Sequence, residues 1–252
     1  MPTLEIVLYA FVGGILPAFV WLFFLMKEDA RCPEPRSLIL LAMFAGMLCV
    51  PIVLPLEHYV KAIMPTLTAV PTLFDRFALN LAIEMPVIIA WAAIEETVKF
   101  ALAALLILWR KAVDEPIDLI IYMICVALGF SALENALFLV APLANGDVAQ
   151  TVLANNLRFI GATLLHVIAS ATVGFAMALA YTKMRHVRPF AVALGLILAI
   201  ALHALFNFLI IRETASHTVL AFLLVWVGAV VGFGLFETLR YARYHRLPTN
   251  TC

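Results

Sequence analysis

Apolar runs recur along the chain, separated by short polar segments. Most of these runs reach the length of about 20 residues that a helix needs to cross the hydrocarbon core of a bilayer. The pattern therefore predicts an all-α, polytopic transmembrane helical bundle with about seven spans. The expected spans are 5–26, 37–56, 86–109, 117–140, 157–181, 190–211 and 218–239.

The composition supports a membrane protein. Hydrophobic residues make up 65% of the chain and charged residues only 13%, whereas soluble domains are about half apolar and a quarter charged. The net charge is zero, which argues against nucleic acid as a partner. The four cysteines show no paired spacing, so we expect neither a disulfide framework nor a thiolate metal site. The whole chain, 1–252, is expected to form one membrane-embedded domain.

Lysine and arginine alternate in number between the predicted spans. The segments on one side carry only Lys61, Arg76, Arg158 and Arg212. Those on the other side carry Lys27, Arg31, Arg36, Arg110, Lys111, Lys183, Arg185, Arg188, Arg240, Arg243 and Arg246. Because cytoplasmic loops are enriched in these residues, we expect the N-terminus outside the cell and the C-terminus in the cytoplasm.

Two segments leave alternatives open. Residues 57–85 mix apolar and charged residues. A helix around 74–84 could lie at the outer surface and bend at Pro86, or the third span could begin with a plain helical extension. In the last span, Gly228 and Gly232 form a GxxxG motif. This motif indicates close helix packing within one chain and leaves a homodimer as the alternative.

The third span interrupts its apolar run with Glu95, Glu96 and Lys99. Ionisable groups inside a bilayer cost about 2.5 kcal/mol or more each, so they are functional candidates. On a helix, these three side chains lie near one face, because Lys99 follows each glutamate by three or four residues. Lys99 can therefore neutralise part of the charge, and the remaining carboxylate needs a partner from another span.

Polar residues on three further spans lie at a similar depth. They are Glu134 and Asn135 in the fourth span, His166 in the fifth, and His203 and Asn207 in the sixth. At ~1.5 Å of rise per residue, the acids and imidazoles fall roughly 9–14 Å below the outer ends of their spans. Independent structural residues have no reason to share a depth. We therefore expect one buried site in the outer third of the membrane.

Several of these residues also have a purely structural interpretation. A single histidine in a membrane helix is more often a hydrogen-bonded packing group than a ligand. Asn135 could have no role beyond bridging two helices, and Glu84 could be solvated at the membrane interface. Lys99 is better explained as the charge partner of the glutamates than as a catalytic base. For three buried acids, however, packing gives no explanation, so we expect a function for Glu95, Glu96 and Glu134.

Water attack on a carbonyl, and hence peptide hydrolysis, is the chemistry that suits such a site. Zinc could be bound by Glu134, His166 and His203, with an open position for a water molecule of lowered pKa. A spare glutamate would then take the proton. Alternatively, a buried glutamate activates water without a metal, and His203 and Asn207 stabilise the oxyanion.

Two other classes of protein could use the same residues. In a proton- or cation-coupled transporter, the buried acids and Lys99 would form a relay. In a haem-binding membrane protein, His166 and His203 would be axial ligands. The acids argue against haem, and the chain shows no inverted repeat typical of transporters. An intramembrane endopeptidase is therefore the preferred hypothesis.

Four motifs occur in order on successive spans: Glu95-Glu96-x-x-Lys99, Phe130-x-x-x-Glu134-Asn135, His166 and His203-x-x-x-Asn207. Together they resemble the PrsW family of intramembrane proteases, which groups with the CAAX-prenyl endopeptidases and other glutamic-type membrane peptidases. The resemblance covers about 84–211. It implies that Glu95 or Glu96 is the base, and that His203 and Asn207 are oxyanion donors or metal ligands.

The same resemblance carries expectations about the substrate. The CAAX branch has a histidine where this chain has Glu134, which argues against a prenylated substrate. PrsW proteins are described as metalloproteases that cut membrane-bound anti-sigma factors near the outer face. We therefore expect zinc as the cofactor, a single-span membrane protein as the substrate, and a location in a bacterial inner membrane.

Overall fold

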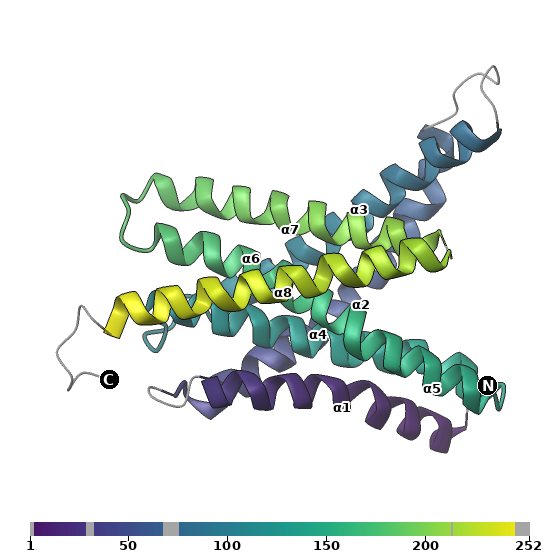
Figure 1. Ribbon diagram of the computed structural model, residues 1–252, viewed down its shortest axis with the longest axis horizontal. Coiled ribbons are helices and arrows are strands. Elements are labelled where there is room, and N and C mark those ends of the chain that lie inside the picture. Colours follow the sequence, from purple (N-terminus) through teal and green to yellow (C-terminus); the bar gives the residue numbers. More distant parts are fainter. Residues whose placement is uncertain (1–2, 29–32, 68–75, 213, 245–252) are drawn as a thin grey trace.

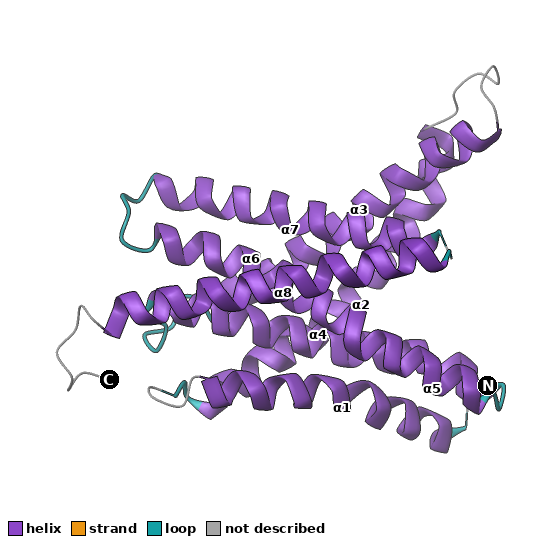
Figure 2. Cartoon of the chain, in the orientation of Figure 1, coloured by secondary structure: helices purple, strands orange, loops and turns teal. Residues whose placement is uncertain are grey.

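The computed structural model describes residues 3–28, 33–67, 76–212 and 214–244, and all regular structure in these ranges is helical (Figures 1 and 2). The helices in chain order are α1 (Leu4–Glu28), α2 (Arg36–Leu67), α3 (Arg76–Leu106), α4 (Pro116–Ala144), α5 (Val148–Leu157), the π-helical turn η1 (Arg158–Ala162), α6 (Thr163–Ala180), α7 (Val187–Ile211) and α8 (Ala215–Tyr244). The predicted all-α polytopic bundle is confirmed.

Within the described residues, six helices are long and apolar enough to cross a membrane, and they coincide with six of the seven predicted spans. The remaining predicted span, 86–109, falls largely within α3, which is not one of the six and carries the charged residues of the third span. In Figure 1, α1 begins at the right-hand end of the bundle, the long helices alternate in direction, and α8 ends at the left. With the start of α1 and the end of α8 at opposite ends of the bundle, the chain must cross an odd number of times. A seventh span formed by α3 is consistent with this topology and stays a prediction.

The segment between the second and third predicted spans is more helical than expected. Helix α2 continues to Leu67, and α3 begins at Arg76 and runs without a break through Pro86. This is the helical extension, and not a separate surface helix. Residues 74–75 of the alternative lie outside the described part of the chain.

Helix α4 is the centre of the bundle, because α1, α2 and α6 all pack against it. Glycines make these contacts close. A Cβ atom on Gly46 of α2 would lie 1.9 Å from the Val126 carbonyl oxygen, and one on Gly129 of α4 would lie 1.9 Å from that of Met43. Small residues permit such backbone approach between membrane helices. The close packing fixes the faces of α4 and α6 that carry the site.

The glycines of the GxxxG motif face α6 of the same chain. A Cβ atom on Gly228 would lie 3.3 Å from Ile168, and one on Gly232 would lie 3.9 Å from Phe175. This arrangement is what packing within one chain requires. A homodimer stays a prediction.

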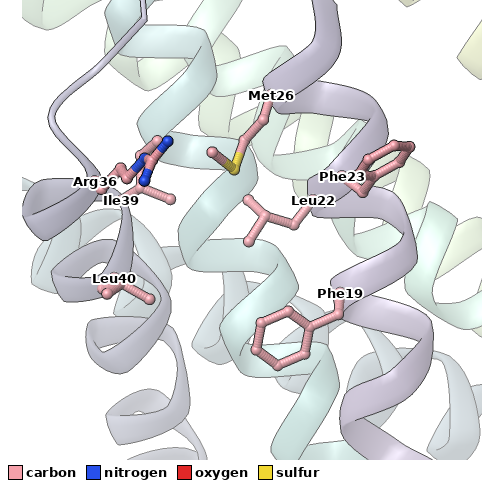
Figure 3. A pocket seen from close by; sticks show the side chains of 7 residues that line it. All are labelled: Phe19, Leu22, Phe23, Met26, Arg36, Ile39 and Leu40. Carbon is pink, nitrogen blue, oxygen red and sulfur yellow. The ribbon is translucent and has the colours of Figure 1, made fainter.

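Two apolar grooves on the bundle lie apart from the polar residues of the predicted site. One, of about 320 Å³, lies between α1 and α2 (Figure 3) and is lined by Phe19, Leu22, Phe23, Met26, Arg36, Ile39 and Leu40. The other, of about 550 Å³, lies between α1, α4, α6 and α8. Neither is lined by an acid or a histidine, so the candidate chemistry lies inside the bundle.

Candidate active site

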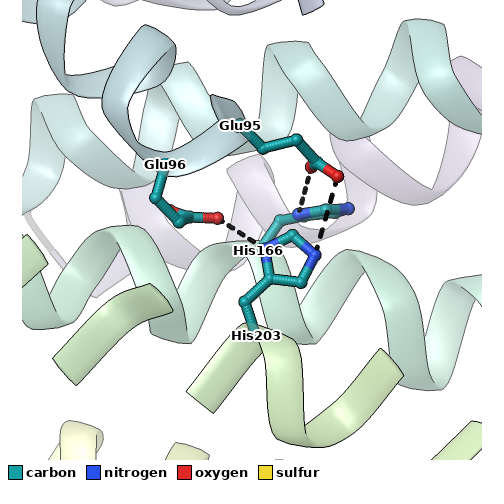
Figure 4. A group of neighbouring side chains, drawn as sticks. All are labelled: Glu95, Glu96, His166 and His203. Carbon is teal, nitrogen blue, oxygen red and sulfur yellow. Dashed lines mark hydrogen bonds and ion pairs between the residues drawn. The ribbon is translucent and has the colours of Figure 1, made fainter. Parts of the chain in front are cut away.

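Five ionisable side chains from three helices meet in one buried cluster. Helix α3 contributes Glu95, Glu96 and Lys99, which are 5%, 0% and 0% exposed. Helices α6 and α7 contribute His166 and His203, which are 2% and 1% exposed. The carboxylates point toward the imidazoles across the interface of α3 with α6 and α7 (Figure 4). The structure thus brings these five predicted residues together.

Lys99 lies at the centre of the cluster. Its Nζ atom is 2.8 Å from Glu96 Oε1, 3.5 Å from Glu95 Oε2 and 2.9 Å from His166 Nδ1. It also lies 4.1 Å from the centroid of the Phe130 ring, a favourable position for a cation. An ammonium group can only donate hydrogen bonds, so His166 Nδ1 must be the acceptor and is unprotonated. Lys99 therefore neutralises the acids, as the helical spacing predicts.

The two glutamates of α3 are held differently. Glu96 Oε1 accepts from Lys99 and from His203 Nδ1 at 2.8 Å, and its Oε2 accepts from Ser170 at 3.3 Å. Glu95 makes looser contacts, at 3.5 Å from Lys99 and 3.8 Å from each histidine. Glu96 is therefore fixed in place, whereas Glu95 retains oxygen atoms that can reach another group.

Glu134 lies on the far side of the His166 ring. Its Oε2 atom is 3.1 Å from His166 Nε2, and it forms an ion pair with Arg158 of η1. The expected zinc ligand Glu134 therefore falls outside the group formed by the α3 glutamates and the two histidines. The physical reason is position: Glu134 contacts Nε2 of the His166 ring, whereas the α3 glutamates lie on the Nδ1 side of that ring.

Asn135 bridges helices, as its structural interpretation predicts. Its amide nitrogen donates to Ser131 Oγ at 3.2 Å and to Thr163 Oγ1 at 2.9 Å, and its oxygen accepts from Arg158 Nε. Ser131 also donates to Thr163 at 3.0 Å. This network joins α4 to α6 beside the cluster.

Comparison with known proteins decides the class of the enzyme. A sequence model described as PrsW family intramembrane metalloprotease matches residues 34–236. The chain belongs to the PrsW family. Protease PrsW of Geobacillus kaustophilus (strain HTA426) is 26% identical over 201 residues, which cover 80% of this chain and 79% of that protein. No solved structure matches.

Membership in this family makes the chain a protease and a multi-pass integral membrane protein. It decides against the transporter and haem alternatives. The geometry also opposes haem, since the His166 and His203 rings meet edge to face with centroids 5.1 Å apart. A porphyrin cannot lie between two rings in direct contact.

Two residues near this site, Asn207 and Glu57, differ from what the sequence analysis expected. Asn207 lies one turn beyond His203 on α7 and is half-buried, but it is not among the described residues that hydrogen-bond within the cluster. Glu57 of α2, which lies in a segment that the sequence analysis placed between two spans, has its carboxyl group close to that of Glu95. Its carbonyl oxygen accepts from Trp91 Nε1 at 3.1 Å.

The cluster contains a donor set that fits a metal ion. One ligand atom each from Glu95, Glu96, His166 and His203 lies within 4.8 Å of all the others. Two donors bound to one zinc ion lie roughly 3–4 Å apart, because each bond is about 2.0–2.2 Å long. His166 Nδ1 and His203 Nε2 each lie 3.8 Å from a Glu95 oxygen. Imidazole and carboxylate are ligands that zinc prefers.

The charges near the cluster also favour a cation. The three acids that form ion pairs here, Glu95, Glu96 and Glu134, outnumber their cationic partners, Lys99 and Arg158, while the histidines are neutral. A divalent cation would offset this excess. Lys99 donates a hydrogen bond to the lone pair of His166 Nδ1. A metal ion bound at that nitrogen would displace this hydrogen bond, and Lys99 would keep its hydrogen bond to Glu96.

Proposed function

We propose that this PrsW-family protease hydrolyses a peptide bond of a single-span membrane protein near the outer face of the membrane. An anti-sigma factor is the kind of substrate that the family resemblance implies. The observation that carries the proposal is the buried meeting of two glutamates, two histidines and one lysine between α3, α6 and α7. Packing interactions of these side chains would not offset the free-energy cost of burying so many ionisable groups in a membrane.

In this proposal, His166, His203 and Glu96 hold a zinc ion, and Glu95 is the general base. Zinc would supply a water molecule of lowered pKa and polarise the scissile carbonyl. Glu96 suits a fixed ligand because Lys99, His203 and Ser170 orient it. Glu95 suits the base because its contacts in the cluster are longer. Glu134 then acts on His166 Nε2 and does not bind the metal.

The proton has a path in this arrangement. Glu95 takes it from the attacking water, and Glu57 offers a second carboxyl group with which it can be shared. Glu95 can then return the proton to the leaving amine. Asn207 lies one turn from His203 and has an amide that could donate to the oxyanion.

The outer position of the site rests on the expected orientation. His203 lies eight residues before the end of α7, and Glu134 lies ten residues before the end of α4. At ~1.5 Å per residue, these positions are about 12 and 15 Å below the ends of their helices. With the N-terminus outside, both of these helix ends face outward.

Mapping of cleavage sites tests the proposed function. Proteoliposomes would contain the purified protein and a set of single-span membrane proteins, and mass spectrometry would identify new N-termini. We expect new termini within the outer half of the substrate helix or directly outside it, because the site lies at that depth. Cleavage only in soluble loops, or at the cytoplasmic end, would contradict the proposal. A chain carrying both Glu95→Gln and Glu96→Gln is the matched control.

A further inference from the structure

Arg158 occupies the one π-helical segment among the described residues. It is the first residue of η1, the turn that joins α5 to α6. Short π-helical turns are frequent at functional sites, because they rotate the following residues and re-aim a side chain. The sequence pattern treated Arg158 only as one of four basic residues on the outer side. The structure instead directs its side chain, which is 17% exposed, into the bundle.

The guanidinium group of Arg158 contacts one turn of α4 through three different interactions. It forms an ion pair with Glu134, donates its Nε hydrogen to Asn135 Oδ1, and stacks on Phe138 at 3.8 Å from the ring centroid. A planar guanidinium with its fixed fork of donors can make all three contacts at once. Arg158 and His166 Nε2 contact the same Glu134 oxygen, Oε2, so the pairing with Arg158 fixes the oxygen that faces His166.

Glu134 passes this constraint to the cluster. A carboxylate paired with arginine offers only acceptor oxygens, so His166 Nε2 at 3.1 Å must carry the hydrogen. The neutral imidazole then has its lone pair on Nδ1, which points to Lys99 at 2.9 Å and Glu95 at 3.8 Å. Both ends of the His166 ring therefore agree on one tautomer. The opposite tautomer would set an N–H group against the ammonium of Lys99.

We propose that Arg158 is a positioning residue of the proteolytic site, which acts through Glu134 to hold His166 as the tautomer with its Nδ1 lone pair facing the α3 glutamates. This inference rests on the proposed function for its effect on proteolysis. The pairing of Arg158 with Glu134 leaves His166 Nδ1 available to Lys99 or to a metal ion. The role of Glu134 is then to orient the His166 ring. Carboxylate partners of metal-binding histidines set ring orientation in this manner.

Nitrogen NMR of histidine-labelled protein in lipid tests the tautomer directly. The His166 signals would be assigned by comparison with a His166→Asn chain. In the wild type, we expect a protonated Nε2 and an unprotonated Nδ1. The substitution Arg158→Met keeps an unbranched apolar stem for Phe138 but removes every donor. We expect a mixture of tautomers for His166 in this variant, because only the contact with Lys99 then favours the Nδ1 lone pair.

The same variants predict a specific change in kinetics. Loss of such a partner reduces activity by about 10–100-fold, so kcat of Arg158→Met should fall by this factor while KM changes little. Arg158→Lys keeps a cation for Glu134 and should recover most of the wild-type tautomer and at least part of kcat. Arg212→Ala is the control, because Arg212 also stacks on an aromatic ring, Phe208, at 4.6 Å from its centroid.

Each outcome decides the inference. A wild-type tautomer and kcat in Arg158→Met would overturn it. Reduced kcat with unchanged His166 signals, or equal losses in Arg158→Lys and Arg158→Met, would also overturn it, since these results indicate a merely structural residue. If Arg158→Met does not fold, the Arg158→Lys spectrum and kcat decide. If the wild type cleaves no substrate, the proposed function fails, whereas the NMR measurement still tests the effect of Arg158 on His166.

Discussion

Replacement of Glu95 by glutamine is expected to reduce proteolysis by roughly 10²–10⁴-fold, the usual contribution of a positioned general base. Glutamine has nearly the same shape but cannot take a proton from water. The cluster should stay folded, because Glu95 makes only long contacts with Lys99 and the two histidines. The measurement is the rate of substrate cleavage in proteoliposomes at equal amounts of folded protein.

The control for this experiment is Glu237→Gln. Glu237 lies on α8, where it pairs with Arg240 at 2.6 Å and takes no part in the cluster. This variant should cleave at the wild-type rate. If Glu95→Gln also cleaves at that rate, Glu95 is not the base and the assignment of roles within the cluster fails.

Replacement of Lys99 by methionine is expected to have the largest effect on stability. Lys99 is fully buried and neutralises Glu96 at 2.8 Å and Glu95 at 3.5 Å. Removal of one partner from a buried ion pair costs about 3–5 kcal/mol, because the other charge is left without compensation. The midpoint of thermal unfolding in detergent should therefore fall sharply, and proteolysis should be lost with it.

A double substitution separates charge from packing in this prediction. In a chain with Lys99→Met and Glu96→Gln, the unpaired carboxylate is gone, so part of the lost stability should return. Lys183→Met, in the exposed turn between α6 and α7, serves as the control and should leave the midpoint unchanged. If Lys99→Met unfolds at the same midpoint as the wild type, Lys99 does not neutralise the charge of the cluster.

The helices and the core of the cluster could be predicted from the sequence because both follow from strong energetic terms. A span of about 20 apolar residues is required by the thickness of the bilayer, and buried charges are too costly to occur without a reason. The sequence was therefore sufficient to identify Glu95, Glu96 and Lys99 as candidates. Their depth in the third span then indicated His166 and His203, which lie at a similar depth in other spans. Family membership then agreed with the protease hypothesis.

The partners of Glu134 and Glu95 could not be predicted in the same way. Depth along a helix follows from counting residues, but rotation about the helix axis depends on packing. The π-helical turn at Arg158 changes that rotation, so an arginine assigned to the outer surface reaches Glu134. Glu57 was missed because α2 continues beyond the apolar run that predicted its end. One signal was available: a buried acid needs a cation, and Arg158 lies at the outer end of the next span.

Metal content is the most direct test of the central claim that the buried cluster is a metal-dependent proteolytic site. Elemental analysis of the detergent-purified wild type would be compared with His166→Ala and His203→Ala. We expect about one zinc ion per chain in the wild type, lost from both variants together with proteolysis. A folded wild type that cleaves its substrate without bound metal would contradict the account, and glutamate-activated water would take its place.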